Sequence, residues 1–274
     1  MNRAVAALAC LAAGLAACGG SSDEEGTAIV CVFTNCKESP DVALADISPR
    51  YEVSQEGSRV TVSGNLGYRY NVLTVVRIGG TDDLTTTSGT QTRRVDATDD
   101  TRLLYATSLD GQGQNPTVSV DFVRSGLANR STVTLPATFT IVSPTGPVSL
   151  ALSAGQLLVD VSVPATETLV VHADGSCLRA DGTAFNVKAL SAPASLVTAV
   201  PGGSRYRIDT PDLSALLDAN SISDGSSQAQ VASCELQLGW QRQQYGTSPA
   251  SMHPSGYILG MALQRMNVHY DAVH

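Results

Sequence analysis

The chain has 274 residues, a formal net charge of −8 and aromatic side chains at only 5% of its positions. The acidic balance excludes nucleic acid as a partner, because a nucleic-acid binder needs a basic patch to displace counterions from the phosphates. The length is sufficient for two domains of roughly 100 to 200 residues, and the many Ser, Thr, Val and Gly residues favour strands and turns.

The first residues follow the order of parts of a secretory signal peptide. A single cation, Arg3, precedes an apolar run over residues 4–13, and Leu15-Ala16-Ala17-Cys18 comes next. The run is shorter than the roughly 20 apolar residues that span a bilayer. The four residues resemble the lipobox of bacterial lipoproteins, in which a Leu and two small residues precede a Cys.

That resemblance, which covers only about the first twenty residues, implies cleavage before Cys18 and acylation of this cysteine, and several acyl chains make a stable membrane anchor. Gly19 stands where an Asp would, by the enterobacterial sorting rule, favour the inner membrane, so the resemblance implies the outer membrane. We therefore expect a signal peptide over 1–17 and a lipidated, flexible tether over 18–40. The alternative is an ordinary signal peptide cut after Ala17, with Cys18 unmodified.

Four cysteines remain once Cys10 has left with the signal peptide and Cys18 carries the lipid. An even number in an exported protein predicts disulfides. The predicted pairs are Cys31–Cys36 and Cys177–Cys234. A zinc site is the competing interpretation, but Cys31-x4-Cys36 does not have the spacing of a zinc ribbon and has no other Cys or His close in sequence.

The segment 41–143 contains short runs of alternating apolar residues separated by turn residues. Seven or more strands in about 100 residues predict an Ig-like β-sandwich. The expected strands are 59–63, 70–78, 83–87, 92–96, 102–107, 117–123 and 131–142. Pro144 and Pro147 then interrupt strand pairing, because proline cannot donate to a ladder, and they mark the predicted domain boundary.

The segment 148–274 predicts a second β-rich sandwich with one short helix. Thr210 is the expected N-cap of that helix and Pro211 its first residue, with Leu213, Leu216 and Leu217 on one side. The expected strands are 156–163, 168–173, 183–190, 205–209, 230–245 and 257–271. The last two should pair as an antiparallel hairpin, and the alternation from Ala232 to Trp240 gives the first of them a dry face and a wet face.

The loop of this hairpin, 246–255, is the candidate binding site. Pro249 and Pro254 limit its freedom, and it brings Met252 and His253 close to Tyr245 and Tyr257. Loops on a rigid sandwich are the usual carriers of recognition. The alternative is that Tyr245 and Tyr257 form a cross-strand pair under a structural loop. A second aromatic group, Tyr68-x-Tyr70 beside Arg69, is also a candidate for an exposed surface.

No catalytic motif stands out, since G-x-S-x-G, a P-loop, H-E-x-x-H and G-x-G-x-x-G are absent from the sequence. The weak metal candidates are His269, Asp271 and His274 at the end of the chain, and His172 with Asp174. We expect no cofactor.

The sequence thus predicts an all-β protein with two Ig-like β-sandwich domains in tandem after a lipidated tether, and one short helix in the second domain. The favoured function is a non-enzymatic envelope lipoprotein that binds an envelope protein or a glycan. Two alternatives stay open: a metal-dependent or hydrolytic enzyme with a site in the second domain, and a periplasmic carrier of a small ligand.

Overall fold

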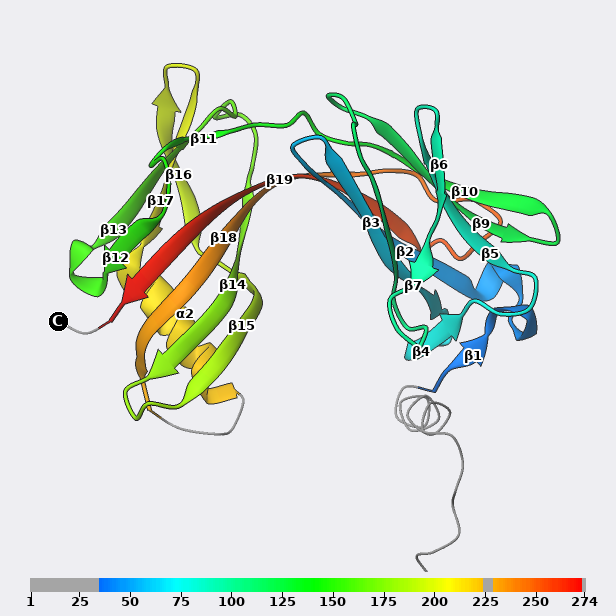
Figure 1. Cartoon of the computed structure of the whole chain (residues 1–274), viewed down its shortest axis with the longest axis horizontal. Coiled ribbons are helices and arrows are strands. Elements are labelled where there is room, and N and C mark those ends of the chain that lie inside the picture. Colours follow the sequence, from blue (N-terminus) through cyan, green and yellow to red (C-terminus); the bar gives the residue numbers. More distant parts are fainter. Residues whose placement is uncertain (1–34, 224–228, 273–274) are drawn as a thin grey trace, which may run out of the picture.

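The computed structural model describes residues 35–223 and 229–272. Within these ranges regular structure is almost entirely β, with a single α-helix, and no helix is long and apolar enough to cross a membrane. The predicted all-β fold with Ig-like sandwiches and one helix is confirmed (Figure 1). The predicted signal peptide, Cys18, Cys31 and His274 lie outside the described residues.

The first sandwich pairs one small sheet, in the order β10-β9-β5-β6, with part of a larger sheet. Its core holds Ile47, Leu66 and Phe122, each fully buried. The elements, in chain order, are β1 (Lys37–Glu38), η1 (Ser39–Asp41), η2 (Leu44–Asp46), β2 (Ile47–Glu56), β3 (Arg59–Tyr68), β4 (Asn71–Arg77), β5 (Asp83–Ser88), β6 (Gln91–Arg94), β7 (Asp96–Ala97), β8 (Tyr105–Leu109), β9 (Thr117–Arg124) and β10 (Leu127–Thr134).

The second sandwich has its own small sheet, β11-β13-β17-β16, and it also completes its core with the larger sheet. The elements are β11 (Ile141–Ser143), β12 (Val148–Ala151), η3 (Leu152–Ala154), β13 (Gln156–Val161), β14 (Val170–Arg179), β15 (Ala184–Ser191), β16 (Ala194–Val200), β17 (Gly203–Asp209), α2 (Thr210–Ser223), β18 (Val231–Tyr245) and β19 (Tyr257–Asp271).

One large sheet runs through both sandwiches. Its main path is β1-β4-β3-β2-β19-β18-β14-β15, so β19 connects the strands of the first sandwich to those of the second. Residues 257–262 of β19 pair in parallel with β2, and residues 268–271 pair in parallel with β12. The paired strands β18 and β19 therefore run from one lobe of Figure 1 into the other and connect the two sandwiches. The predicted antiparallel hairpin is confirmed, but its strands do not remain in the second domain as expected.

The chain passes from the first core to the second before the predicted boundary. Leu135 belongs to the first core, whereas Phe139 belongs to the second. Ile141 then starts β11, which pairs with β13 of the second sandwich. The crossing segment is thus 136–138, ahead of Pro144, because a strand of the second sandwich already precedes that proline.

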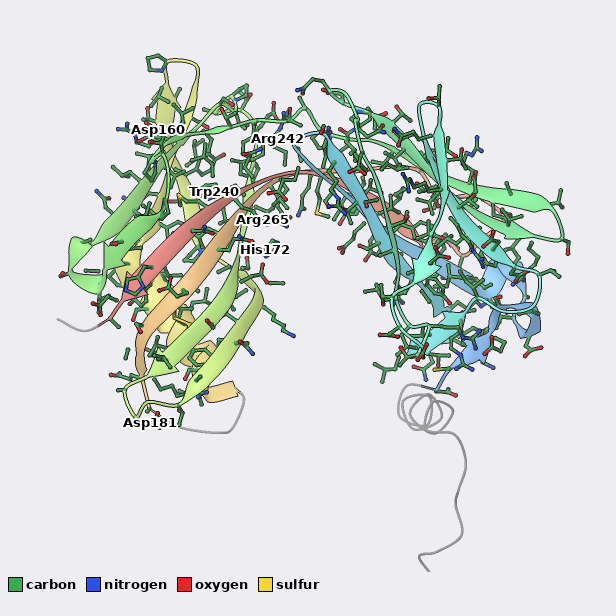
Figure 2. The ribbon with its side chains drawn as sticks, viewed as in Figure 1. Asp160, His172, Asp181, Trp240, Arg242 and Arg265 are labelled. Atoms are coloured by element: carbon green, nitrogen blue, oxygen red, sulfur yellow. A yellow bond between two sulfur atoms is a disulfide. The ribbon has the colours of Figure 1, made fainter. Side chains whose placement is uncertain are left out.

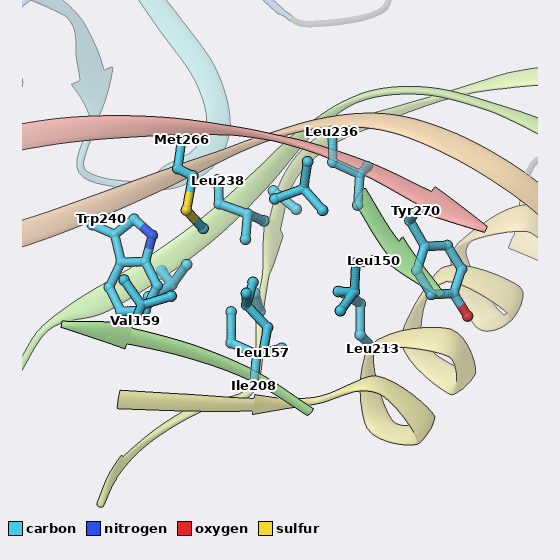
Figure 3. Packing of buried hydrophobic residues seen from close by; sticks show 14 of the residues in the cluster. Leu150, Leu157, Val159, Ile208, Leu213, Leu236, Leu238, Trp240, Met266 and Tyr270 are labelled. Carbon is cyan, nitrogen blue, oxygen red and sulfur yellow. The ribbon is translucent and has the colours of Figure 1, made fainter. Parts of the chain in front are cut away.

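The inward faces of β18 and β19 form one wall of the second core. Figure 3 shows Leu236, Leu238 and Trp240 facing side chains of β13 and β17. Trp240 is fully buried and packs edge-on against Tyr206, with 5.7 Å between the ring centroids. The predicted dry face is confirmed, since apolar side chains on alternate residues of β18 point to one side.

Helix α2 lies where the sequence predicts it, and Leu213 and Leu217 are buried in the second core. The Thr210 hydroxyl donates to the Leu152 carbonyl at 2.8 Å, so it ties the helix to η3. Near the other end, the buried guanidinium of Arg179 donates to the carbonyl of Ser221 at 2.8 Å and to its hydroxyl at 2.7 Å. A cation at a helix C-terminus also complements the helix dipole.

The predicted disulfide between Cys177 and Cys234 is present, and it joins directly opposed residues of β14 and β18. Cys36 is also disulfide-bonded. Its pairing with Cys31 stays a prediction.

Replacing Cys177 and Cys234 together by Ala should lower the free energy of unfolding, because the bond closes a 57-residue separation in the unfolded chain. The chain-entropy model gives about 4 kcal/mol for such a loop. Urea unfolding followed by circular dichroism measures the change. The next cross-strand pair, Ser176 and Glu235, is exposed, and its double replacement by Ala is the control. Equal losses in the two variants would contradict the prediction.

Candidate binding site

The loop predicted to bind a partner is packed onto the first sandwich instead. Met252 is only 3% exposed and belongs to the first core. The backbone N–H of His253 donates to the Ile47 carbonyl at 2.9 Å. Thr132 and Thr247 exchange two backbone hydrogen bonds, of 2.9 and 2.8 Å. Met252 was expected to be exposed together with His253, and for Met252 this expectation is wrong. The loop packs against the small sheet of the first sandwich, which buries the Met252 side chain.

The two tyrosine rings contact each other, as the structural alternative expects, although Tyr245 is directly opposite Leu259 in the ladder. The rings of Tyr245 and Tyr257 meet edge-on, with 6.4 Å between their centroids. Tyr245 remains 70% exposed. Burial, and next the charge of Glu52, raise the pKa of Tyr257. The imidazole Nδ1 of His253 lies 2.7 Å from the Ser255 hydroxyl. This part of the hairpin is therefore a structural clasp with one exposed aromatic ring.

Met252→Ser should destabilise the protein, because removing a buried methionine side chain leaves a cavity and costs about 2 to 5 kcal/mol. For a chain of this size that corresponds to a fall in melting temperature of roughly 5 to 15 °C. Differential scanning calorimetry measures it. Tyr245→Ser removes a larger but exposed side chain and serves as the control. A Met252→Ser protein that melts with the wild type would show that the loop does not contribute to the core.

The metal candidates that lie within the described residues do not assemble into a site. His172 lies in β14, where its Nδ1 is buried without a hydrogen-bond partner. The carboxylate of Asp174 accepts a hydrogen bond from the Ala189 N–H at 2.8 Å. His269 lies on β19, and its Nδ1 is 2.7 Å from the Glu235 carboxylate across the ladder. Among the described residues no three His, Cys, Asp or Glu side chains come together as a group that could hold a metal ion.

A groove at the junction of the two sandwiches is a concave site among the described residues. It has a volume of about 370 Å³. Segments far apart in the sequence line it: Asn115, Pro136, Ala137, Glu167, Thr168, Arg242, Gln243 and Gln244. Most of these side chains are polar, and three of them carry amides. Figure 2 places Arg242 at the junction between the two lobes.

Arg242 fixes the walls of this groove. Its Nη1 donates to the carbonyl of Ala137 at 2.7 Å, and its Nη2 forms an ion pair with the carboxylate of Glu167. Only 18% of the Arg242 side chain is exposed, against 39% for Glu167. One guanidinium therefore joins β18 to the crossing segment and to the loop before β14. Charge-assisted contacts of this kind are stronger than neutral ones, so the groove is preorganised.

The part of β18 that lines the groove has no strand of the described chain paired to one of its two edges. Pairing of β18 with β14 ends at Gln241, which is opposite Val170. Residues 242–245 of β18 continue to pair with β19 on their other side. The sequence does contain a signal for this place. Alternation stops there, because Gln241-Arg242-Gln243-Gln244 puts polar residues on both faces of the strand, as expected where neither face lies in an apolar core.

Comparison with known proteins gives only distant likenesses. The chain matches no protein-family model and no curated protein sequence. It is similar to a structure of tandem Ig repeats of Dlar, at 7% identity and a TM-score of 0.30, over 83% of this chain and 97% of that one. It is similar to the BSP domain of a biofilm associated protein, at 12% identity and a TM-score of 0.24, over 89% of this chain and 32% of that one.

A third similar structure is Dpr11 IG1 bound to DIP-gamma IG+IG2, at 8% identity and a TM-score of 0.22, over 82% of this chain and 99% of that one. These scores are low, so the class of the protein follows from its own sheets: it is an all-β protein of two Ig-like sandwiches joined through one continuous sheet.

Proposed function

We propose that the chain is an acylated protein of the bacterial envelope that binds a polar ligand in the groove between its two sandwiches. The observation that carries the proposal is the Arg242 junction. The groove is preformed because a shared sheet and an ion pair hold its walls, and its volume falls within the range of roughly 300 to 1,000 Å³ that is usual for ligand sites.

The lining favours a glycan segment as the ligand. Side-chain amides donate and accept hydrogen bonds on the same group, and sugar hydroxyls do both as well. Asn115, Gln243 and Gln244 supply three such amides, and the opposite charges of Arg242 and Glu167 compensate each other. A strongly charged ligand would gain little from this lining, whereas a neutral polyhydroxyl segment would find a partner at each wall.

A second candidate ligand is an extended segment of an envelope protein. The free edge of β18 over residues 242–245 could accept a short added strand, and strand addition to an exposed edge is a recurrent mode of peptide recognition. The two candidates differ in what holds the ligand. Side-chain amides would hold a glycan, whereas backbone groups of β18 would hold a peptide strand.

Replacing Gln243 and Gln244 together by Ala should weaken glycan binding without unfolding the protein, since both side chains are exposed. We expect at least a tenfold loss of affinity, because each lost hydrogen bond contributes about 1 kcal/mol. An array of envelope oligosaccharides identifies a ligand, and calorimetric titration measures its affinity. Gln237→Ala, on an exposed part of the same strand, is the matched control. If the double variant keeps wild-type affinity for the identified glycan, the groove is not the glycan site.

Anchoring rests on the lipobox resemblance and has its own test. Cys18→Ser should leave the protein unprocessed or release it from the membrane fraction, because the sulfur that accepts the lipid is gone. Labelling with radioactive palmitate and fractionation of the cells measure the outcome. Absence of label from the wild-type protein, together with processing that resists globomycin, would contradict the proposal.

A further inference from the structure

The turn between β3 and β4 carries an exposed apolar tip. Tyr70 is 64% exposed and Leu73 is 72% exposed. A register shift produces this tip. Tyr68 pairs with Asn71, but Gly67 pairs with Val75, so three residues of β4 bulge out of the ladder. Within this bulge Thr74 is fully buried, whereas the Leu73 side chain points into solvent and is not part of the first core.

Cationic and aromatic side chains surround the tip. The Arg69 guanidinium carbon lies 4.1 Å from the centroid of the Tyr70 ring, and the Lys37 ammonium lies 5.0 Å from that of Tyr68. The centroids of the two tyrosine rings are 5.3 Å apart. Asp46 orients Arg69 through a 3.1 Å contact with its Nε. Tyrosine and cations beside an apolar residue form the combination that favours the interfacial layer of a bilayer.

The chain enters the first sandwich beside this tip. The Asn35 side-chain amide donates to the Thr74 hydroxyl at 3.2 Å, at the position where the described residues begin. β1 then runs parallel to β4, with Lys37 opposite Val76. Figure 1 shows both strands at the lower edge of the first sandwich. The first described residue therefore lies beside the tip.

We propose that Tyr70 and Leu73, with Lys37 and Arg69, form a docking surface for the phospholipid bilayer that holds the acylated Cys18. The inference rests on the proposed anchoring. The 16 residues 19–34 span at most about 55 Å when fully extended, so an anchor at Cys18 keeps the tip within reach of the lipid. Tethering makes the encounter intramolecular, and weak surface contacts are then sufficient. The cations of Lys37 and Arg69 complement anionic headgroups.

The test uses the full acylated protein, reconstituted into vesicles of phosphatidylethanolamine, phosphatidylglycerol and brominated phosphatidylcholine. Leu73→Trp introduces a fluorescent reporter at the tip, and the native Trp240 is fully buried in the second sandwich. Brominated lipid should reduce the emission of the reporter by a factor of about two relative to unbrominated vesicles, because interfacial side chains lie near the acyl boundary. Wild-type emission should not change. Leu196→Trp, at an exposed site of β16, is the control and should also be unaffected.

A second substitution shows whether the tip itself makes the contact. Tyr70→Ser in the Leu73→Trp protein should reduce the quenching, whereas Tyr245→Ser, which removes an equally exposed ring elsewhere, should not. Protein that floats with the vesicles and carries acyl chains, but shows no quenching, would overturn the docking while anchoring stands. Protein without acyl chains that does not float would overturn both. Emission that changes with protein concentration rather than with lipid would assign the tip to a second copy of the chain.

Discussion

The backbone ladder of the β18–β19 hairpin is the interaction on which the rest of the structure depends. One strand, β19, pairs with β2 in the first sandwich and with β12 in the second. Each sandwich completes its core with strands of the same sheet. Movement of one lobe against the other would break ladder hydrogen bonds, and an orphaned backbone group is costly when it is buried. Domains joined by a simple linker would move freely by comparison.

Local pattern was sufficient to predict much of this fold. Both hairpin strands, the helix from Thr210 and the Cys177–Cys234 bond follow from alternation, capping signals and the count of cysteines. β2 was missed because Pro49 stands inside it and cannot donate to a ladder. β16 was missed because its residues are mostly exposed, so it has little alternation.

The shared sheet and the groove could not be predicted from the sequence for a different reason. Parallel pairing of β19 with β2 joins residues about 200 positions apart. Alternation of apolar and polar residues indicates which face of a strand is buried, but it does not indicate which strands pair with it. The loop around Met252 has the composition of a recognition loop, yet burial in a distant core decides its role. Nothing in the sequence distinguishes Arg242 from the other arginines. Its role depends on the fold, which brings the crossing segment and Glu167 into contact with it.

The continuous sheet fixes the position of the groove relative to the exposed tip of the first sandwich. In Figure 1 β1 and β4 lie at the lower edge of the first sandwich, whereas Figure 2 places Arg242 at the upper junction of the lobes. Because one sheet connects these two places, their separation is fixed by hydrogen bonds rather than by a linker. A bilayer at the tip would then lie at the opposite edge from the junction that holds the groove. A ligand reaching it would meet a preorganised surface, and less conformational entropy would be lost on binding than with two independently moving domains.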